Sequence, residues 1–197
     1  MSIVVQHEKR RKEILEKALT VFMDDGFEDT TYQRIADKCG ITRTTLYLYF
    51  KNKKEIFSYS IKQLLLSVEE HINQTRGDKS LNSIDKITKV LLDIIKLLEQ
   101  NRRLLSVILD YLLHLSKNDG NPELRVRRRT VRLRHILSSL VIEGVKTGEL
   151  KKVKIKTADD FLYSFIEAAI YQLAILKHKN LNELKEAVIF AVKLFAV

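Results

Sequence analysis

The chain has 197 residues, of which 45% are hydrophobic and 30% charged, a balance that favours a folded protein over a disordered one. A formal net charge of +10 favours a polyanionic partner, although most of the basic surplus lies after residue 120. The single cysteine, Cys39, excludes an internal disulfide and a cysteine-rich metal site, and we expect it simply to pack.

One proline and six glycines leave few helix breakers, and the hydrophobic periodicity predicts an all-α fold of about nine helices with no convincing strand. Start and stop residues set the expected bounds. The helices are expected over residues 8–24, 32–38, 43–49, 52–74, 83–99, 101–116, 121–146, 157–177 and 180–197, with N-caps at Thr30, Thr42, Asn52, Asn121, Thr157 and Asn180.

The N-terminal residues contain no long apolar run and no cleavage-like site, and no segment approaches an uninterrupted membrane span. We therefore expect a cytoplasmic protein without membrane insertion. No glycine-rich phosphate loop, zinc-like pattern or serine elbow occurs, so the chain reads as a binding protein rather than an enzyme, with no cofactor or metal.

Residues 30–50 have the organisation of a helix-turn-helix: a short helix, a turn over Cys39, Gly40 and Ile41, and a second short helix. Gly40 stands where such a turn needs a positive φ. The second short helix has three residues that look apolar and core-facing, namely Leu46, Leu48 and Phe50. Its other side chains are polar, which suggests that its outer face has a partner outside the chain.

At 100° per residue, Arg43, Thr44 and Tyr47 share one side of this second helix and Leu46 lies away from them. Arginine can form paired bonds to guanine, and threonine can offer a methyl to thymine or a hydroxyl to phosphate. Lys51 and Lys53 flank the start of the next helix, where a phosphate is favoured. The pattern predicts a major-groove reader of DNA.

The stretch Arg10 to Phe57, "RRKEILEKALTVFMDDGFEDTTYQRIADKCGITRTTLYLYFKNKKEIF", resembles the TetR/AcrR family of bacterial transcriptional regulators. The "LYxYF" ending followed by "KNK" is more specific than a generic helix-turn-helix. The resemblance covers about the first 60 residues. It implies a DNA-binding domain over residues 1–54 and a helical ligand-binding and dimerisation domain over residues 55–197.

The resemblance further implies a homodimer formed by the last two helices, a palindromic double-stranded operator, and release of DNA by a small-molecule effector that binds the C-terminal domain. Repression is the expected mode. Carried over by position, the residues expected to bind DNA are Thr31, Tyr32, Gln33, Thr42, Arg43, Thr44, Thr45, Tyr47, Tyr49, Lys51 and Lys53. Arg43 is expected to contact a base, whereas Tyr49 could instead be a packing residue, and Lys51 and Lys54 could be plain solvated surface.

The helices over residues 161–176 and 187–197 are apolar nearly all round, which requires burial on every side. Either a four-helix bundle with a second copy or an ordinary monomer core would satisfy this requirement. The residues expected at a dimer interface are Phe161, Phe165, Ala169, Leu173, Leu184, Val188 and Val192.

Polar side chains within apolar helices are the only indication of an effector site, which we expect to be largely hydrophobic. The candidates are His71, Tyr111, His114, Tyr163, Glu167 and Tyr171, although a lone histidine on an apolar face is more often a satisfied core residue than a ligand group. The arginine-rich run Arg125–Arg134 could bind an anion, a membrane or nucleic acid, or could be a solvated face. The alternative to a ligand-responsive repressor is a helical interaction protein that binds nucleic acid or membranes by charge alone.

Overall fold

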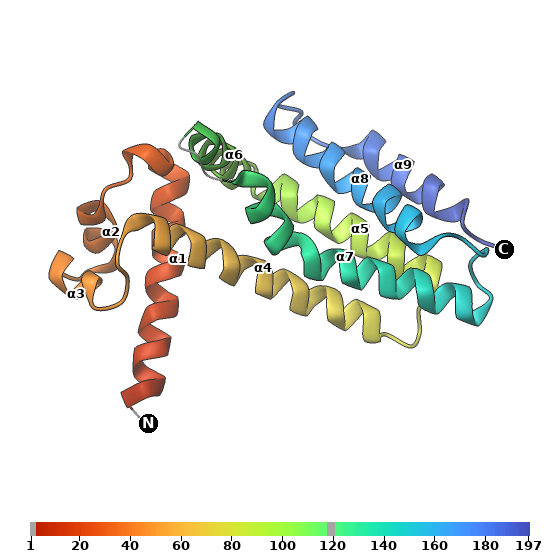
Figure 1. The fold of residues 1–197 in the computed structure, drawn as a ribbon, viewed down its shortest axis with the longest axis horizontal. Coiled ribbons are helices and arrows are strands. Elements are labelled where there is room, and N and C mark those ends of the chain that lie inside the picture. The colour runs from red at the N-terminus through yellow and green to blue at the C-terminus, as the bar shows by residue number, and fades with distance from the viewer. Residues whose placement is uncertain (1–2, 118–120) are drawn as a thin grey trace. The chain divides into compact units, whose positions relative to one another are not determined.

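A computed structural model describes residues 3–117 and 121–197 (Figure 1). Over these residues it contains nine α-helices and, apart from one antiparallel bridge between Leu150 and Ala196, no strand, which confirms the all-α prediction. The helices are α1 (Ile3–Asp29), α2 (Tyr32–Cys39), α3 (Arg43–Tyr47), α4 (Lys53–Gly77), α5 (Ser83–Gln100), α6 (Arg102–Lys117), α7 (Pro122–Thr147), α8 (Ile155–Ala174) and α9 (Asn182–Lys193).

The helices form two compact units that do not follow chain order. Among the described residues, unit 1 comprises 3–67 and 106–117, and unit 2 comprises 68–105 and 121–197. Helices α4 and α6 each contribute to both units. The domain boundary expected after residue 54 stays a prediction, since compactness alone does not define a functional domain.

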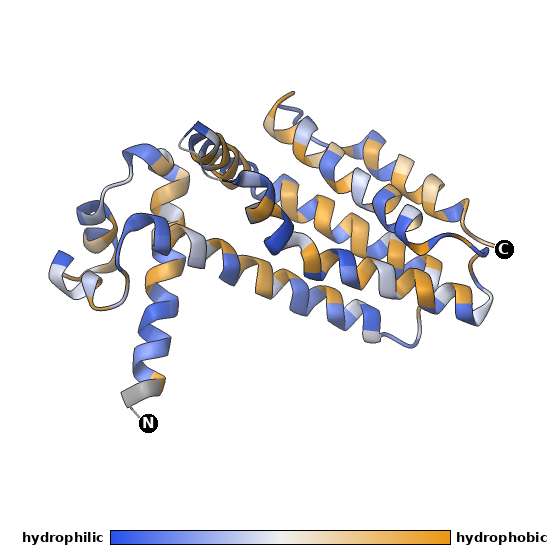
Figure 2. Cartoon of the chain, viewed as in Figure 1, coloured by the Kyte–Doolittle hydropathy of each residue, from blue (hydrophilic) through white to orange (hydrophobic). Residues whose placement is uncertain are grey.

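Unit 1 is built around the C-terminal half of α1, whose apolar stripe packs against α2, α3 and the start of α4. Ile35 and Ala36 of α2, Leu46 of α3 and Phe50 after it are all buried in this core. An aromatic cluster extends the core: the Phe57 ring centroid lies 4.9 Å from those of both Phe22 and Tyr111, and Phe27 lies 4.6 Å from Tyr111. Figure 2 shows the contrast with the N-terminal half of α1, which is mostly hydrophilic.

Helix α1 extends beyond the predicted 8–24 at both ends. Gly26 interrupts it with φ 81° and ψ 171°, a conformation that only glycine adopts readily, after which one more helical turn runs to Asp29. The predicted end at residue 24 is therefore wrong, because the helix resumes after Gly26. The turn after Gly26 places the Thr30 hydroxyl on the Gly26 carbonyl oxygen, at 2.5 Å.

Unit 2 contains α5, α7, α8 and α9, which lie side by side (Figure 1). Each contributes an apolar stripe to a common core. The fully or nearly fully buried residues include Val90, Leu91 and Ile95 of α5, Leu137 and Leu140 of α7, Leu162, Ile166 and Ala169 of α8, and Val188 and Val192 of α9. None of the helices in the described ranges is both long enough and apolar enough to cross a bilayer.

Three predicted N-caps are confirmed and three are wrong. The Thr42, Asn52 and Asn121 side chains accept from the backbone amides of Thr45, Glu55 and Leu124, at 3.1, 2.9 and 2.7 Å. The cap of α2 is Thr31 rather than Thr30, because Thr30 is engaged with Gly26. Helices α8 and α9 begin after Lys154 and Leu181, with no side-chain cap, instead of after Thr157 and Asn180.

Candidate nucleic-acid interface

Helices α2 and α3 form a tight helix-turn-helix whose angle is set at Gly40. This residue is left-handed, with φ 67° and ψ 37°, and its amide donates to the Asp37 carbonyl oxygen at 3.0 Å. The amide of Ile41 donates to the Ala36 carbonyl oxygen at 3.1 Å, which closes the end of α2. Thr42 directly follows this turn and caps α3, so the connection between the two helices is short.

The outer face of α3 carries the side chains that the sequence analysis assigned to DNA. Arg43 and Thr44 are exposed, and Tyr47 is 49% exposed. The Arg43 Nη2 donates to the Tyr47 hydroxyl at 3.2 Å, and the guanidinium carbon lies 5.7 Å from the centre of the Tyr47 ring. Leu46 is fully buried beneath them, so α3 is held by its inner face while a donor-rich face points outward.

Leu48 is not a core residue, contrary to the sequence-based expectation. Its side chain is 75% exposed, whereas its neighbours Leu46 and Phe50 are buried at 0% and 2% exposure. The reason is geometric: α3 ends at Tyr47, and the chain needs only Leu46 and Phe50 to anchor this segment on the core.

Tyr32 was expected to contact phosphate, but the structure commits its hydroxyl to the interior. The residue is buried, and the hydroxyl donates to the Phe50 carbonyl oxygen at 2.5 Å. Its ring stacks on Tyr47, with centroids 4.5 Å apart and planes inclined by 24°. Burial raises the pKa of Tyr32 to about 12, and the nearby Tyr47 and Glu55 act in the same direction. Tyr32 therefore supports the Tyr47 ring with its own ring, while its hydroxyl is bonded to the protein backbone.

Lys53 was also expected to bind phosphate, but its ammonium group closes a turn of the protein. The Nζ donates to the carbonyl oxygens of Glu28, at 2.6 Å, and Thr30, at 3.1 Å. It also lies 5.1 Å from the centre of the Phe27 ring. The start of α4 is thus tied to the end of α1 and to Thr30, which precedes α2.

The other predicted DNA-binding residues keep accessible positions around α2 and α3, with differing freedom. Thr31 and Thr42 use their hydroxyl oxygens as helix caps, and Thr42 Oγ1 lies 2.8 Å from Thr45 Oγ1. The Gln33 side chain donates to Asp37 at 2.7 Å. Thr44 and Lys51 are exposed, as is the neighbouring Lys54, which was not in the predicted set.

Tyr49 takes the packing alternative. It is half-buried against the core of unit 1, and its ring stacks on His7 of α1, with centroids 4.6 Å apart. A second support, which the sequence analysis missed, is Arg11, whose guanidinium carbon lies 5.1 Å from the Phe50 ring centre and 4.6 Å from that of Tyr59. The only sequence signal for either contact was the basic run near the start of α1, which the periodicity could not orient.

Most of the residues predicted for a dimer interface lie on the inner faces of α8 and α9. Five of the seven are buried inside the chain itself, because they form the inner stripes of α8 and α9: Ala169, Leu173, Leu184, Val188 and Val192. The monomer-core alternative therefore holds for these five. Phe161 is exposed and Phe165 half-buried.

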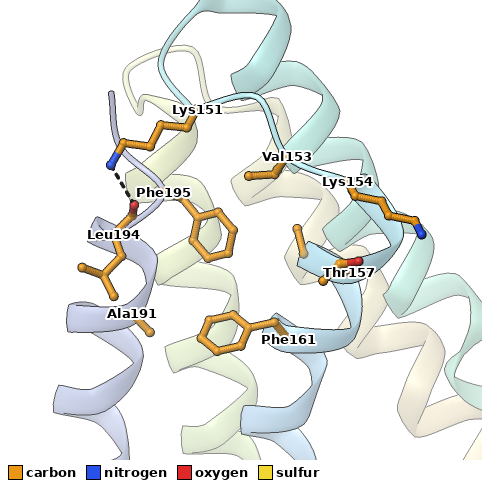
Figure 3. Close-up of a pocket in the computed structure, with 9 residues that line it drawn as sticks. Lys151, Val153, Lys154, Thr157, Phe161, Ala191, Leu194 and Phe195 are labelled. Carbon is orange, nitrogen blue, oxygen red and sulfur yellow. Dashed lines mark hydrogen bonds between the residues drawn. The ribbon is translucent and has the colours of Figure 1, made fainter.

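The outward faces of α8 and α9 are nevertheless apolar. Tyr171 of α8 and Ile175 after it are more than half exposed, as are Phe190 of α9 and Leu194 after it. Near one end of this surface is an apolar hollow of about 460 Å³, where Phe161 and Phe195 face each other and Lys151 donates to the Leu194 carbonyl oxygen at 3.2 Å (Figure 3). It is lined by Lys151, Val153, Lys154, Thr157, Ala158, Phe161, Ala191, Leu194 and Phe195.

None of the six residues predicted for an effector site lines this hollow. Tyr111 and His114 belong to unit 1, where His114 Nδ1 lies 2.7 Å from a Glu28 carboxylate oxygen. In unit 2, Tyr163 is buried beneath the Arg134 guanidinium, which lies 4.5 Å from its ring centre. The remaining three, His71, Glu167 and Tyr171, are exposed, and His71 lies 3.4 Å from Asp93.

The arginine-rich run of α7 is partly engaged in ion pairs. Arg132 binds Glu69 at 3.2 Å, and Arg134 binds both Asp159, at 3.1 Å, and Asp160. Arg128 is exposed, and the side chains of Arg125 and Arg129 lie outside the described residues. The ion pairs of Arg132 and Arg134 favour the solvated-face alternative for this run.

Comparison with known proteins agrees with the geometry. Residues 14–59 match the family described as bacterial regulatory proteins, tetR family. The chain is 26% identical over 172 residues to the fatty acid metabolism regulator protein of Bacillus subtilis (strain 168), covering 83% of this chain and 84% of that protein.

Solved structures share the fold over almost the whole chain. FadR from Bacillus subtilis, crystallised with stearoyl-CoA, superposes with a TM-score of 0.74 at 21% identity, covering 91% of this chain and 96% of that one. A TetR transcription regulator from Haloarcula marismortui ATCC 43049 gives a TM-score of 0.80 at 18% identity, covering 96% and 97%.

The matched residues 14–59 are those that build the core, the Gly40 turn and the outward face of α3 in unit 1. The rest of the chain follows the same all-helical architecture in relatives of nearly equal length. The chain therefore belongs to the TetR family of bacterial regulatory proteins, and it is a DNA-binding transcriptional regulator rather than an enzyme.

Proposed function

We propose that this protein is a homodimeric repressor that binds a palindromic operator and leaves it when a small molecule binds. The observation that carries the DNA-binding role is the outward face of α3, where Arg43, Thr44 and Tyr47 are exposed on a helix that is anchored by Leu46. Such a helix fits the major groove, where an arginine fork can bond to guanine O6 and N7.

A second copy is the natural cover for the outer faces of α8 and α9. Phe161 and Ala168 of α8 lie on one stripe with Ile175, which directly follows the helix, and Phe161 and Ile175 are equally far from Ala168 in sequence. When a two-fold axis pairs a helix with its own copy antiparallel, positions at equal distances from the axis meet. An axis near Ala168 would place a small residue at the crossing and join Phe161 to Ile175 of the second copy.

Two-fold symmetry also accounts for an operator with two half-sites. A dimer would present two α3 helices, and half-sites one DNA turn apart, about 34 Å, would place both in successive major grooves on the same side of the duplex. The operator is therefore expected to be palindromic, with each half read by one copy of Arg43 and its neighbours.

Long-chain acyl-CoA is the effector class that we propose. The support is the similarity to the Bacillus subtilis fatty acid metabolism regulator and to FadR crystallised with stearoyl-CoA. Because a ligand shifts an equilibrium only through unequal affinity for two states, an effector must bind the DNA-free form more tightly than the DNA-bound form. Stearoyl-CoA should then weaken operator binding, and free coenzyme A should not. If stearoyl-CoA binds but leaves operator affinity unchanged, it is not the effector.

The DNA-binding role is tested by selecting duplexes from a random pool and measuring the affinity of the selected operator over a salt series. A repressor should prefer the operator over random DNA by at least a thousandfold at physiological salt. Equal affinity for both would instead favour a protein that binds by charge alone.

A matched pair of variants then tests whether α3 is the element that contacts the bases. Arg43→Ala should weaken operator binding about tenfold or more and relax preference at one base position. Arg128→Ala removes the same kind of side chain from an exposed site on α7 and should change neither. Equal losses in the two variants would contradict α3 as the reader.

A further inference from the structure

Leu48 is the most exposed large apolar side chain among the described residues of unit 1. It is 75% exposed, against 61% for Leu113 and 52% for Val5. It is absent from the buried core cluster and from the partly buried residues packed on it. An isolated exposed leucine on an arbitrary surface would need no explanation, but this one lies beside the face that we assign to the major groove.

The backbone keeps Leu48 pointing outward. The amides of Tyr49 and Phe50 both donate to the Leu46 carbonyl oxygen at 3.1 Å, and the Leu48 amide donates to Thr45 at 3.1 Å. Turning Leu48 inward would displace Leu46 or Phe50, which are almost completely buried. Its exposure is therefore built into the end of α3.

The outward-facing side chains of α3 and of Leu48 after it form two rows. Leu48 keeps helical backbone angles, with φ −68° and ψ −22°, so the spacing of α3 extends to it. Residues four apart on a helix are neighbours, which places Thr44 next to Leu48 and Arg43 next to Tyr47. The Arg43–Tyr47 row is polar and joined by a 3.2 Å hydrogen bond. The Thr44–Leu48 row offers one methyl group and one isobutyl group.

We propose that Leu48, with the Thr44 methyl beside it, reads thymine through the thymine 5-methyl group. This proposal rests on the proposed DNA-binding function and adds a specificity-determining residue to it. Among the base edges of the major groove, thymine alone presents an apolar group. An apolar side chain that contacts this group therefore distinguishes thymine from the other bases. Arg43 and Leu48 then divide the reading between guanine and thymine.

The test uses full-length protein and the operator selected by the wild-type protein. Each thymine of the operator is replaced in turn by deoxyuridine, which removes the 5-methyl group and leaves base pairing intact. For the wild-type protein, one or two symmetric positions should lose affinity by roughly threefold to tenfold, the effect of losing one or two buried methyl contacts. Leu48→Ala should lose a similar factor on the intact operator and then show no further loss at those positions.

Leu113→Ala is the matched control, since it makes the same change at an exposed leucine of the same unit. It should bind both operators as the wild type does. The proposal is overturned if Leu48→Ala binds the intact operator normally, or if it loses as much affinity from deoxyuridine as the wild type does. A failure to select any preferred duplex would instead contradict the proposed function, so the two failures are distinguishable.

Discussion

Replacing Lys53 by methionine separates two roles for this residue: gripping a phosphate and holding the protein's own backbone. Methionine retains much of the apolar stem but cannot donate to the carbonyl oxygens of Glu28 and Thr30, which now lie 2.6 and 3.1 Å from Nζ. It also removes the cation that faces the Phe27 ring at 5.1 Å. The variant should therefore unfold more easily.

The expected loss follows from these three contacts. A hydrogen bond from a charged donor contributes about 1.5 kcal/mol or more when sheltered, and a cation–π contact about 0.5 kcal/mol at exposed sites. The Lys53 side chain is half-buried and one of its bonds is exposed, so solvent screening reduces the sum. We expect the free energy of unfolding to fall by about 2 kcal/mol, which moves a urea midpoint by about 1 M.

Two measurements decide the matter: urea unfolding, and operator affinity as a function of salt. Lys53→Met should lower stability while leaving the salt slope of binding unchanged, and Lys54→Met, at an exposed neighbouring lysine, should leave stability unchanged. A phosphate contact would instead reduce the salt slope by about 0.9. Unchanged stability together with a reduced slope would refute the structural role of Lys53.

Three further changes have definite expected outcomes. Tyr32→Phe removes the hydroxyl that donates to Phe50 and should lower the free energy of unfolding by about 1 kcal/mol. Folding raises the pKa of Tyr32 from 10 to about 12, so the protonated hydroxyl stabilises the fold fully below pH 10 and progressively less towards pH 12. The difference in unfolding free energy between wild type and variant should therefore stay constant from pH 7 to 9 and become smaller above pH 10. A difference that grows above pH 10 would contradict this. Gly26→Ala should lower the free energy of unfolding, measured by heat or urea, by about 1–3 kcal/mol. The cause is the positive φ alone, since nothing lies within 4 Å of an added Cβ. Gly77→Ala is the control, because Gly77 is equally uncrowded but has no positive φ, and it should leave the free energy of unfolding unchanged. Phe190→Glu, at a 66% exposed position, should leave the monomer folded but weaken self-association at least a hundredfold in sedimentation; an unchanged dimer would place the interface elsewhere.

The helix-turn-helix of α2 and α3 was predicted well from the sequence, because residues close together in the chain determine it. Gly40 was identifiable from the requirement for a positive φ between two short helices, and Thr42 as a helix cap from its place before α3. The outward positions of Arg43, Thr44 and Tyr47 followed from helical spacing alone. Each of these inferences needs only a few neighbouring residues.

Two side chains have partners that the sequence did not reveal, because those partners are distant in sequence. Lys53 is bound by backbone carbonyl groups more than twenty positions earlier, and Tyr32 bonds to the carbonyl group of Phe50. Leu48 follows the apolar alternation of Leu46 and Phe50, but the end of α3 turns it to solvent.

Helices α8 and α9 show the same limit on a larger scale. A helix that is apolar nearly all round has an inner and an outer face that composition cannot distinguish. Val188, which was predicted for a subunit interface, is buried within the chain, whereas Phe190 of the same helix is exposed.

The hydrogen bond between Arg43 and the Tyr47 hydroxyl has a thermodynamic consequence for recognition. A free arginine side chain carries about 2 kcal/mol of rotamer entropy, much of which must be lost when it docks on a base. Tyr47, itself stacked on the buried ring of Tyr32, already limits that freedom in the unbound protein. Part of the ordering therefore accompanies folding rather than DNA binding. Tyr47→Phe would remove the hydroxyl that Arg43 bonds to and leave the charge and length of Arg43 unchanged. Calorimetry of this variant should show a less favourable entropy of DNA binding.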